Sequence, residues 1–288
     1  YDSVRPRQLE PVDAKATSMT AARSPEEVFR YLPEWQGATL TVLSGGRTNR
    51  TWLLEKNGRK AVLKIDAEPR TAPYIERRAE AKVQTAAAQA GLASPVLFAD
   101  RQVYLTEYVE GAPWNPVDLD KEGKIEQLAS ALRRLHSLPK TGRSFDARGA
   151  AKLYVQAIEN PDKDLIATCL GVIKKVRLPS YLCCCHNDLV AENIITAPDL
   201  KFLDWEYACD NNPLFDLATI VEHHELSEAQ ARAILDAYFD GSGASWYEKL
   251  VEQQRLYLAL LWLWLASRPD SSNKAINRLG ERVATSCF

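Results

Sequence analysis

Hydrophobic and polar residues alternate along several short runs in the first third of the chain, the pattern of strands that bury one face. The runs at 50–55 and 60–65 flank Asn57-Gly58, a dipeptide typical of tight hairpin turns. Three more runs have the composition of strands, at 39–43, 96–98 and 102–106. The amino-terminal third is therefore expected to contain a small antiparallel sheet.

Two helices are predicted beside this sheet. The first covers 25–32, with Ser24 as its N-cap. The second is an Ala-rich segment, 74–90, which Gly91 ends because glycine readily takes the left-handed conformation that closes a helix.

Beyond residue 111 the hydrophobic period becomes mainly helical. Helices are predicted at 125–138, 164–176, 227–239 and 246–266, with another beginning at 154–158, and short strands at 193–196 and 200–203. The segment 107–116 contains Gly111, Pro113 and Pro116 and is the expected crossover. We predict an α+β fold with a smaller lobe, 1–110, whose first 20 residues are poorly ordered, and a larger helical lobe, 111–288.

Composition and charge narrow the classes of function. The chain has 288 residues, enough to bury a large core, and 36 basic residues against 38 acidic ones. A nucleic-acid binder would show a basic excess, so that class is disfavoured. Scattered basic pairs are interpreted as solvated faces: Arg77-Arg78, Arg133-Arg134 and Lys174-Lys175.

No segment is predicted to enter a membrane. The most apolar stretch, 256–266, has far fewer than the roughly 20 residues that a span requires. Residues 1–20 do not resemble a signal peptide, so a cytoplasmic protein is expected. Because the chain begins with Tyr1, we expect the native start to lie upstream, and the residues indicate no oligomeric state.

Three of the six cysteines are consecutive, Cys183-Cys184-Cys185, within an apolar run. Neighbours on a strand point to opposite faces, so the triplet makes a poor disulfide framework and a poor zinc knuckle. We interpret these cysteines as core residues in a reducing compartment, with a reactive thiol or a metal ligand as less favoured alternatives.

The motif that carries chemistry follows this run. Residues 186–193 read His-Asn-Asp-Leu-Val-Ala-Glu-Asn, and residues 203–208 read Leu-Asp-Trp-Glu-Tyr-Ala after a hairpin-sized gap. H-x-D-x4-N followed by a second Asp is the pattern of a kinase catalytic loop and its magnesium ligands. Phosphoryl transfer needs such groups because positioning and charge neutralisation do most of the work. The motif predicts a kinase.

The sequence resembles the aminoglycoside phosphotransferase and choline/ethanolamine kinase superfamily, and within it the choline kinase branch, including bacterial choline kinases. The resemblance rests on H-N-D-L at 186–189, D-W-E-Y-A at 204–208, and the stretch 211–218 with Glu222. It covers about 40–266 and is strongest over 183–222. It implies the two-lobed protein-kinase-like fold, with ATP and Mg²⁺ as cofactors and a small cationic alcohol as the partner.

Roles follow from this resemblance residue by residue. Asp188 resembles the catalytic base, and Asn193 and Asp204 resemble the magnesium ligands. Lys64, on the strand after Asn57-Gly58, resembles the lysine that contacts the α- and β-phosphates, and Glu80 is expected to pair with it.

Supporting and nucleotide-binding residues are carried over in the same way. His186 is expected to support the catalytic loop, and Asp216 resembles the buried aspartate that braces it. The crossover strand should offer backbone groups at Glu107 and Val109 to adenine. No G-x-G-x-x-G occurs, and the turn that replaces it resembles the G-G-x-[ST]-N turn of small-molecule kinases, with phosphate contacts predicted at Ser44, Gly45, Gly46, Thr48 and Asn49.

A quaternary ammonium offers no ordinary hydrogen bond, so its site needs aromatic faces and carboxylates. Candidates are Glu206, Tyr207, Glu222 and Trp264. Choline kinases carry two Trp three residues apart on the late helix, whereas Trp262 and Trp264 are two apart and lie about 200° from each other. Only one of the two can face the pocket, and Trp264 is the better match to the pocket tryptophans of choline kinases.

Choline or ethanolamine is therefore the favoured substrate, and other acceptors remain open. Thiamine kinases share the D-W-E-Y-A string. Aminoglycoside phosphotransferases bind polycations through an acidic carboxy-terminal region, whereas 268–288 is not acidic. The remaining alternative is a non-catalytic nucleotide-binding pseudokinase, which the intact set of Lys64, Asp188, Asn193 and Asp204 disfavours.

Overall fold

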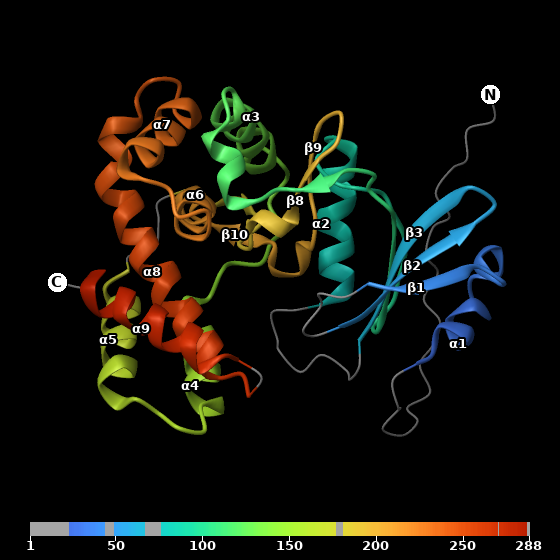
Figure 1. Cartoon of the computed structure of the whole chain (residues 1–288), viewed down its shortest axis with the longest axis horizontal. Coiled ribbons are helices and arrows are strands. Elements are labelled where there is room, and N and C mark those ends of the chain that lie inside the picture. Colours follow the sequence, from blue (N-terminus) through green and yellow to red (C-terminus); the bar gives the residue numbers. More distant parts are fainter. Residues whose placement is uncertain (1–22, 44–48, 67–75, 177–180, 270, 287–288) are drawn as a thin grey trace.

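A computed structural model describes residues 23–43, 49–66, 76–176, 181–269 and 271–286. A sheet of amino-terminal strands lies on one side of the molecule, and the helices of the carboxy-terminal part lie on the other (Figure 1). The α+β, two-lobed fold class predicted from the sequence is confirmed.

The sheet has five antiparallel strands in the order β1-β2-β3-β5-β4. Their bounds are β1 Thr39–Val42, β2 Asn49–Lys56, β3 Arg59–Asp66, β4 Val96–Ala99 and β5 Val103–Glu107. The predicted hairpin joins β2 to β3 through Asn57 and Gly58, which have φ angles of 52° and 74°. Both angles fit the two-residue turn that asparagine and glycine favour, so the local sequence sets this register.

Two helices accompany the sheet. Helix α1, Pro25–Phe29, begins with a capping box between Ser24 and Glu27, as the sequence indicated for its N-cap. Helix α2, Arg77–Gln89, ends before Gly91, whose φ is 75°. It lies between the sheet and the strands β8, Ile194–Thr196, and β9, Leu200–Phe202 (Figure 1).

The chain leaves the sheet through a close backbone approach at Gly111. A Cβ on Gly111 would lie 2.3 Å from the carbonyl oxygen of Thr196, so only glycine fits there. The next strand, β6, Ala112–Pro113, pairs with β8, which pairs with β9. The crossover predicted at 107–116 thus joins the first sheet to the strands around the catalytic motif.

The rest of the chain is mainly helical. Its helices are α3 Lys124–His136, α4 Ala147–Ala157, α5 Lys163–Lys175, α6 Pro213–His223, α7 Glu228–Tyr238, α8 Tyr247–Ala266 and α9 Asn273–Ser286. Short 3₁₀ segments are Pro33–Trp35, Pro116–Asp120, Ala191–Asn193, Trp205–Tyr207 and Gly243–Trp246. The expected start of α4 at 154 was wrong, because Asp146 caps this helix and 154 lies near its end. Helices α6 and α9 had not been predicted.

The largest hydrophobic cluster packs α3, α6 and α7 beneath the catalytic motif and includes the fully buried Trp205. A second cluster joins α4, α5, α8 and α9. Within the described part of the chain, no helix has both the length and the apolar character needed to cross a membrane.

Candidate active site

The catalytic loop is fixed by one buried carboxylate. Strand β7, Cys183–Cys185, pairs with β10, Cys209–Asn211, and ends at His186. Asp216 on α6 is fully buried and accepts the backbone N–H groups of His186 at 2.9 Å and Asn187 at 2.7 Å. Asn187 has a φ of 66°, a conformation that asparagine tolerates better than most residues. Asp216 thus makes the bracing contacts expected of it.

His186 ties the loop to the segment that carries Asp204. Its Nε2 donates to the carbonyl oxygen of Leu203 at 2.8 Å, and its ring centroid lies 4.8 Å from that of Trp205. Burial lowers the pKa of His186, which favours the neutral ring, and Nε2–H of a neutral ring makes the contact with Leu203. His186 therefore has a supporting position.

Asp188 and Asn193 lie in direct contact. The Asn193 amide nitrogen donates to the Asp188 carbonyl at 2.9 Å and to the Asp188 carboxylate at 3.0 Å. Burial, followed by repulsion from Asp204 and Glu206, raises the pKa of Asp188 to about 7. A carboxylate that titrates near neutral pH is suited to accepting a proton from a substrate hydroxyl.

Lys64 reaches this cluster from β3. Its Nζ donates to Oδ1 of Asp204 at 2.9 Å. Burial alone would lower the pKa of Lys64, but the carboxylates of Asp204 and Glu80 outweigh it and the net pKa is raised. Burial opposes ionisation of Asp204, yet Lys64 and then Arg77 hold its pKa below the ordinary value. Both groups therefore remain charged.

The expected ion pair between Lys64 and Glu80 is not formed. Glu80 instead accepts from Arg77 at 2.6 Å, and Arg77 also binds Asp66 at 2.7 Å. Arg77 is 1% exposed, so the interpretation of Arg77-Arg78 as a solvated pair was wrong for its first member. A buried guanidinium requires carboxylate partners, and Glu80, one turn along α2, supplies one.

Part of the predicted nucleotide site lies outside the described residues. This applies to Ser44, Gly45, Gly46 and Thr48 and to the side chain of Asn49. On the crossover segment, the Glu107 N–H donates to Pro95 and the Tyr108 N–H donates to Lys60. Among the described hydrogen bonds of loops and turns none uses the backbone of Val109, so both of its backbone groups are available to an adenine ring.

The predicted cation-binding residues beside Asp204 are close to Asp188. Glu206 is 6% exposed, and its charge helps to raise the pKa values of both Asp188 and Tyr207. Burial is the largest cause for Tyr207, and Tyr154 on α4 also contributes. The arrangement provides aromatic rings and a carboxylate next to the proposed base.

Glu222 and Trp264 are engaged by basic side chains. The carboxylate of Glu222 accepts from Gln254 at 2.6 Å and pairs with Arg282 on α9. The Arg268 guanidinium lies 4.8 Å from the ring centroid of Trp264. Glu222 is therefore neutralised within the fold, and one face of Trp264 already holds a cation.

The two candidate magnesium ligands offer hard oxygen atoms, the type that Mg²⁺ prefers. The side-chain nitrogen of Asn193 donates to Asp188, so the side-chain oxygen of Asn193 is the atom left to bind a metal ion. Asp204 has a φ of 60° at the start of the Trp205–Tyr207 turn and keeps a depressed pKa. The donor set fits a magnesium ion.

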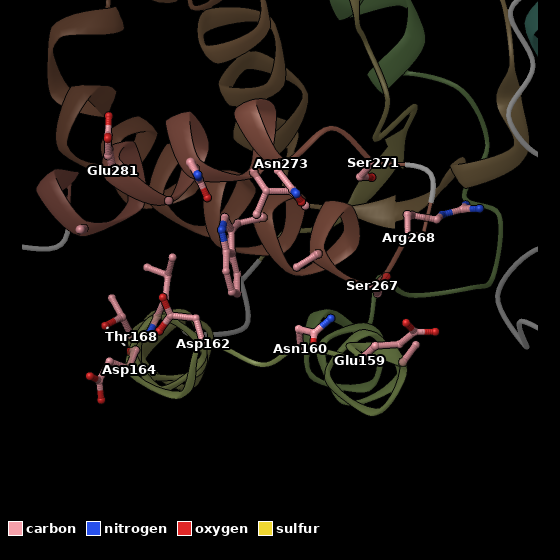
Figure 2. Close-up of a pocket in the computed structure, with 18 of the residues that line it drawn as sticks. Glu159, Asn160, Asp162, Asp164, Thr168, Ser267, Arg268, Ser271, Asn273 and Glu281 are labelled. Carbon is pink, nitrogen blue, oxygen red and sulfur yellow. Dashed lines mark hydrogen bonds between the residues drawn. The ribbon is translucent and has the colours of Figure 1, made fainter.

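A cavity of about 840 Å³ lies apart from this cluster, between α4, α5, α8 and α9. Figure 2 shows Asp162 and Asp164 toward one end of the cavity and Glu159 and Arg268 toward the other. Trp262 lines it and Trp264 does not, and neither Asp188, Asn193 nor Asp204 reaches it. The cavity is therefore distinct from the predicted phosphoryl-transfer residues.

Two contributors to the site were missed by the sequence reasoning. Arg77 helps to keep Asp204 ionised, and its signal would have been Glu80 three residues later on a helix. Tyr257 on α8 interacts electrostatically with Asp188 and Glu222. Only the fold brings α8 against the catalytic loop, so no spacing along the chain could have indicated Tyr257.

Comparison with known proteins shows the family to which the chain belongs. A family model described as "Phosphotransferase enzyme family" matches residues 39–250. Protein LicA of Haemophilus influenzae is 34% identical over 227 residues, which is 74% of this chain and 66% of that protein. The chain thus spans just under two thirds of that relative's length. A thiamine kinase of Shigella boydii is 25% identical over 247 residues, 82% of this chain and 79% of that enzyme.

Solved structures share the fold over nearly the whole chain. The choline kinase LicA from Streptococcus pneumoniae has a TM-score of 0.77 and 21% identity, covering 90% of this chain and 97% of that one. A structure of LicA in complex with AMP also has a TM-score of 0.77 and 21% identity, covering 91% and 96%. The fold is therefore that of kinases of small molecules.

Proposed function

This chain belongs to the phosphotransferase enzyme family, and on that premise we propose that it transfers the γ-phosphoryl group of ATP to the primary hydroxyl of a small cationic alcohol. Choline is the proposed physiological substrate, with ethanolamine as a close analogue. The observation that carries the proposal is the convergence of Lys64, Asp188, Asn193 and Asp204 in one partly buried cluster. The relation to LicA proteins supports choline as the acceptor.

Asp188 is the proposed catalytic base. Its carboxylate is held by Asn193 at 3.0 Å, and its pKa of about 7 allows it to accept the hydroxyl proton as the alcohol attacks. Asp216 fixes the backbone on the amino-terminal side of this residue. The chain thereby orients the attacking oxygen in line with the leaving phosphate.

Residues 1–110 form the proposed nucleotide lobe and 111–288 the proposed substrate lobe. Lys64 would steady the α- and β-phosphates, and the turn at 44–49 and the backbone of Val109 would hold the phosphates and adenine. Asn193 and Asp204 would hold Mg²⁺, which neutralises phosphate charge when bound. The complex of AMP with a protein of this fold supports adenine nucleotide binding.

The proposed acceptor site lies beside Asp188. Glu206 would attract the cation, and Tyr207 and Tyr154 would offer ring faces to it. Trp264 remains a candidate only if the substrate cation binds the face of the Trp264 ring that Arg268 does not cover. Glu222 would not contact the cation directly, because Arg282 and Gln254 already bind its carboxylate oxygens. Its proposed role is to hold these side chains in place and to balance the charge of Arg282.

The test is an assay of ADP release with choline, ethanolamine, thiamine, an amino sugar and kanamycin as acceptors. We expect choline to give the highest kcat/KM and Asp188→Ala to abolish the acceptor-dependent rate. Turnover that survives Asp188→Ala would contradict the mechanism. If no alcohol raises ADP release above background while ATP still binds, the chain is the non-catalytic nucleotide-binding alternative.

A thiamine kinase is the second candidate, and the identity with thiamine kinases over 82% of the chain favours it. Thiamine is also a cation with a primary hydroxyl, so the same cluster could phosphorylate it. The acceptor assay separates the two, because the wrong alcohol should have a much lower kcat/KM.

A further inference from the structure

A second cluster of ligand-type side chains lies behind the catalytic loop. The thiols of Cys183 and Cys185 on β7 and one ring nitrogen of His136 on α3 all lie within 4.8 Å of one another. The three residues are 2%, 0% and 6% exposed, respectively. Among the described residues, no other group of three histidine, cysteine or acidic side chains brings its ligand atoms close enough together to share a metal ion.

The strand geometry brings the two sulfur atoms together. Residues two apart on a strand share a face, so Cys183 and Cys185 point the same way while Cys184 packs into the main hydrophobic cluster. The two sulfur atoms are 3.6 Å apart. Two sulfurs on one tetrahedral zinc, each at about 2.3 Å, lie about 3.8 Å apart. The thiol pair already has nearly the spacing of two zinc ligands.

The histidine is oriented as metal-binding histidines usually are. Nε2 of His136 lies 3.0 Å from the Asp216 carboxylate, and Nδ1 lies 2.7 Å from the hydroxyl of Tyr238. A carboxylate on one nitrogen selects the tautomer that keeps the lone pair on the other. Asp216 therefore leaves the lone pair of His136 on Nδ1, where it now accepts from the Tyr238 hydroxyl, and a metal ion would take the place of that hydrogen bond.

Charge balance favours a divalent ion in this place. Burial raises the pKa of Cys185 well above its ordinary value, so this thiol stays protonated without a counter-charge. A dication with two thiolates is neutral, and its binding releases two protons to solvent. Oxygen atoms for a fourth ligand are close, since Tyr238 contacts His136 and the Asn211 carbonyl accepts from both thiols at 3.8 and 3.5 Å.

We propose that Cys183, Cys185 and His136 form a binding site for a thiophilic d10 dication, with Zn²⁺ as the expected ion. This site is separate from the magnesium ligands of the proposed phosphotransferase and does not depend on that activity. The site is linked to the catalytic loop by Asp216, which contacts His136 and also accepts hydrogen bonds from the backbone of His186 and Asn187. A bound ion should therefore stabilise the loop.

The experiment uses the full chain, reduced and metal-free, with Cys209→Ser and Cys287→Ser to reduce the number of competing thiols. The protein is refolded with Zn²⁺ or Cd²⁺, because the site is buried, and is then examined by native mass spectrometry and ultraviolet absorption. We expect one ion per chain, a mass gain equal to the metal minus two protons, a cadmium–thiolate charge-transfer band, and a higher Tm.

The matched control is Cys184→Ser, an equally buried thiol on the opposite face of β7, which should keep the bound ion. Cys183→Ser with Cys185→Ser should lose the ion, the band and the Tm shift. Because that double variant could fail to fold, X-ray absorption of the cadmium-loaded parent gives a second measure, with two sulfur neighbours expected. The proposal is overturned if the refolded parent binds no ion, if the absorption shows no sulfur neighbours, or if Cys183→Ser with Cys185→Ser folds and retains the ion.

Discussion

The ammonium of Lys64 and the carboxylate of Asp204 lie 2.9 Å apart, although 140 positions separate them along the chain. One residue comes from the second half of β3 and the other from the turn after β9. This contact joins the strand that carries the proposed phosphate-binding lysine to the segment that carries a proposed magnesium ligand. Each group supports the charge of the other, as the raised pKa of Lys64 and the lowered pKa of Asp204 indicate.

Lys64→Met should reduce kcat with ATP by about 10²- to 10³-fold, the typical cost of losing one electrostatic contact to a transition state. The KM for ATP should also rise. The control is Lys60→Met on the same strand, since Lys60 is exposed and pairs with Glu110 at 2.7 Å. Steady-state ADP release measures both variants. A Lys64→Met enzyme within twofold of the parent would exclude the phosphate-binding role.

Arg77→Met should destabilise the fold far more than its position in a basic pair suggests. Its guanidinium is buried between Asp66 and Glu80, so its removal takes a buried positive charge away from both carboxylates. Breaking a buried pair in this way costs about 3–5 kcal/mol. Arg78→Met, at the exposed neighbouring position, should change the free energy of unfolding by less than about 0.5 kcal/mol. Urea denaturation of both variants checks the difference, and equal effects would contradict it.

The sequence was most informative where local chemistry determines the structure. The hairpin at Asn57-Gly58 and the N-cap at Ser24 depend on a few adjacent residues, and both were predicted. Helix α6 was missed because residues 214–221 are buried on every side and show no helical period. Helix α4 was placed too late because Asp146, its N-cap, was not recognised.

The candidate site was predictable in its motif and not in its ion pairs. His186, Asp188 and Asn193 lie within one continuous loop, so their spacing along the sequence was enough to identify the catalytic motif. The partners of Arg77 and Glu222 come partly from distant elements, Asp66 on β3 and Arg282 on α9. Such pairings arise only when the fold brings those elements together, and no pattern along the chain contains them.

Glu206→Gln and Glu222→Gln should differ in their effect on the acceptor. Glu206 lies close enough to Asp188 and Tyr207 to raise their pKa values, so its loss should raise the KM for choline more than it lowers kcat. Glu222 is already paired with Arg282, so its loss should reduce stability and leave the KM within about threefold.

A neutral acceptor provides the control for this comparison. An uncharged alcohol of similar size lacks the attraction to Glu206, so Glu206→Gln should not weaken its binding further. Kinetics with choline and with its carbon isostere, 3,3-dimethylbutanol, measure the difference. If Glu222→Gln raises the choline KM and Glu206→Gln does not, the two carboxylates have been assigned in the wrong order.

His224 should make the fold sensitive to acid. Burial, followed by the neighbouring His223, lowers the pKa of His224 from 6.5 to about 4, while the hydrogen bond with the Pro116 backbone and the charges of Glu192 and Asp118 partly oppose the shift. The unfolded chain therefore binds more protons than the folded chain between these values, so stability is complete above pH 6.5 and is lost as the pH falls toward 4. The contribution is about 3 kcal/mol. His224→Phe keeps a ring of similar size and cannot be protonated, so its free energy of unfolding should fall less than that of the parent between pH 7 and 4.5. Urea denaturation at a series of pH values measures the two slopes, and parallel slopes would show that His224 does not titrate as its burial implies.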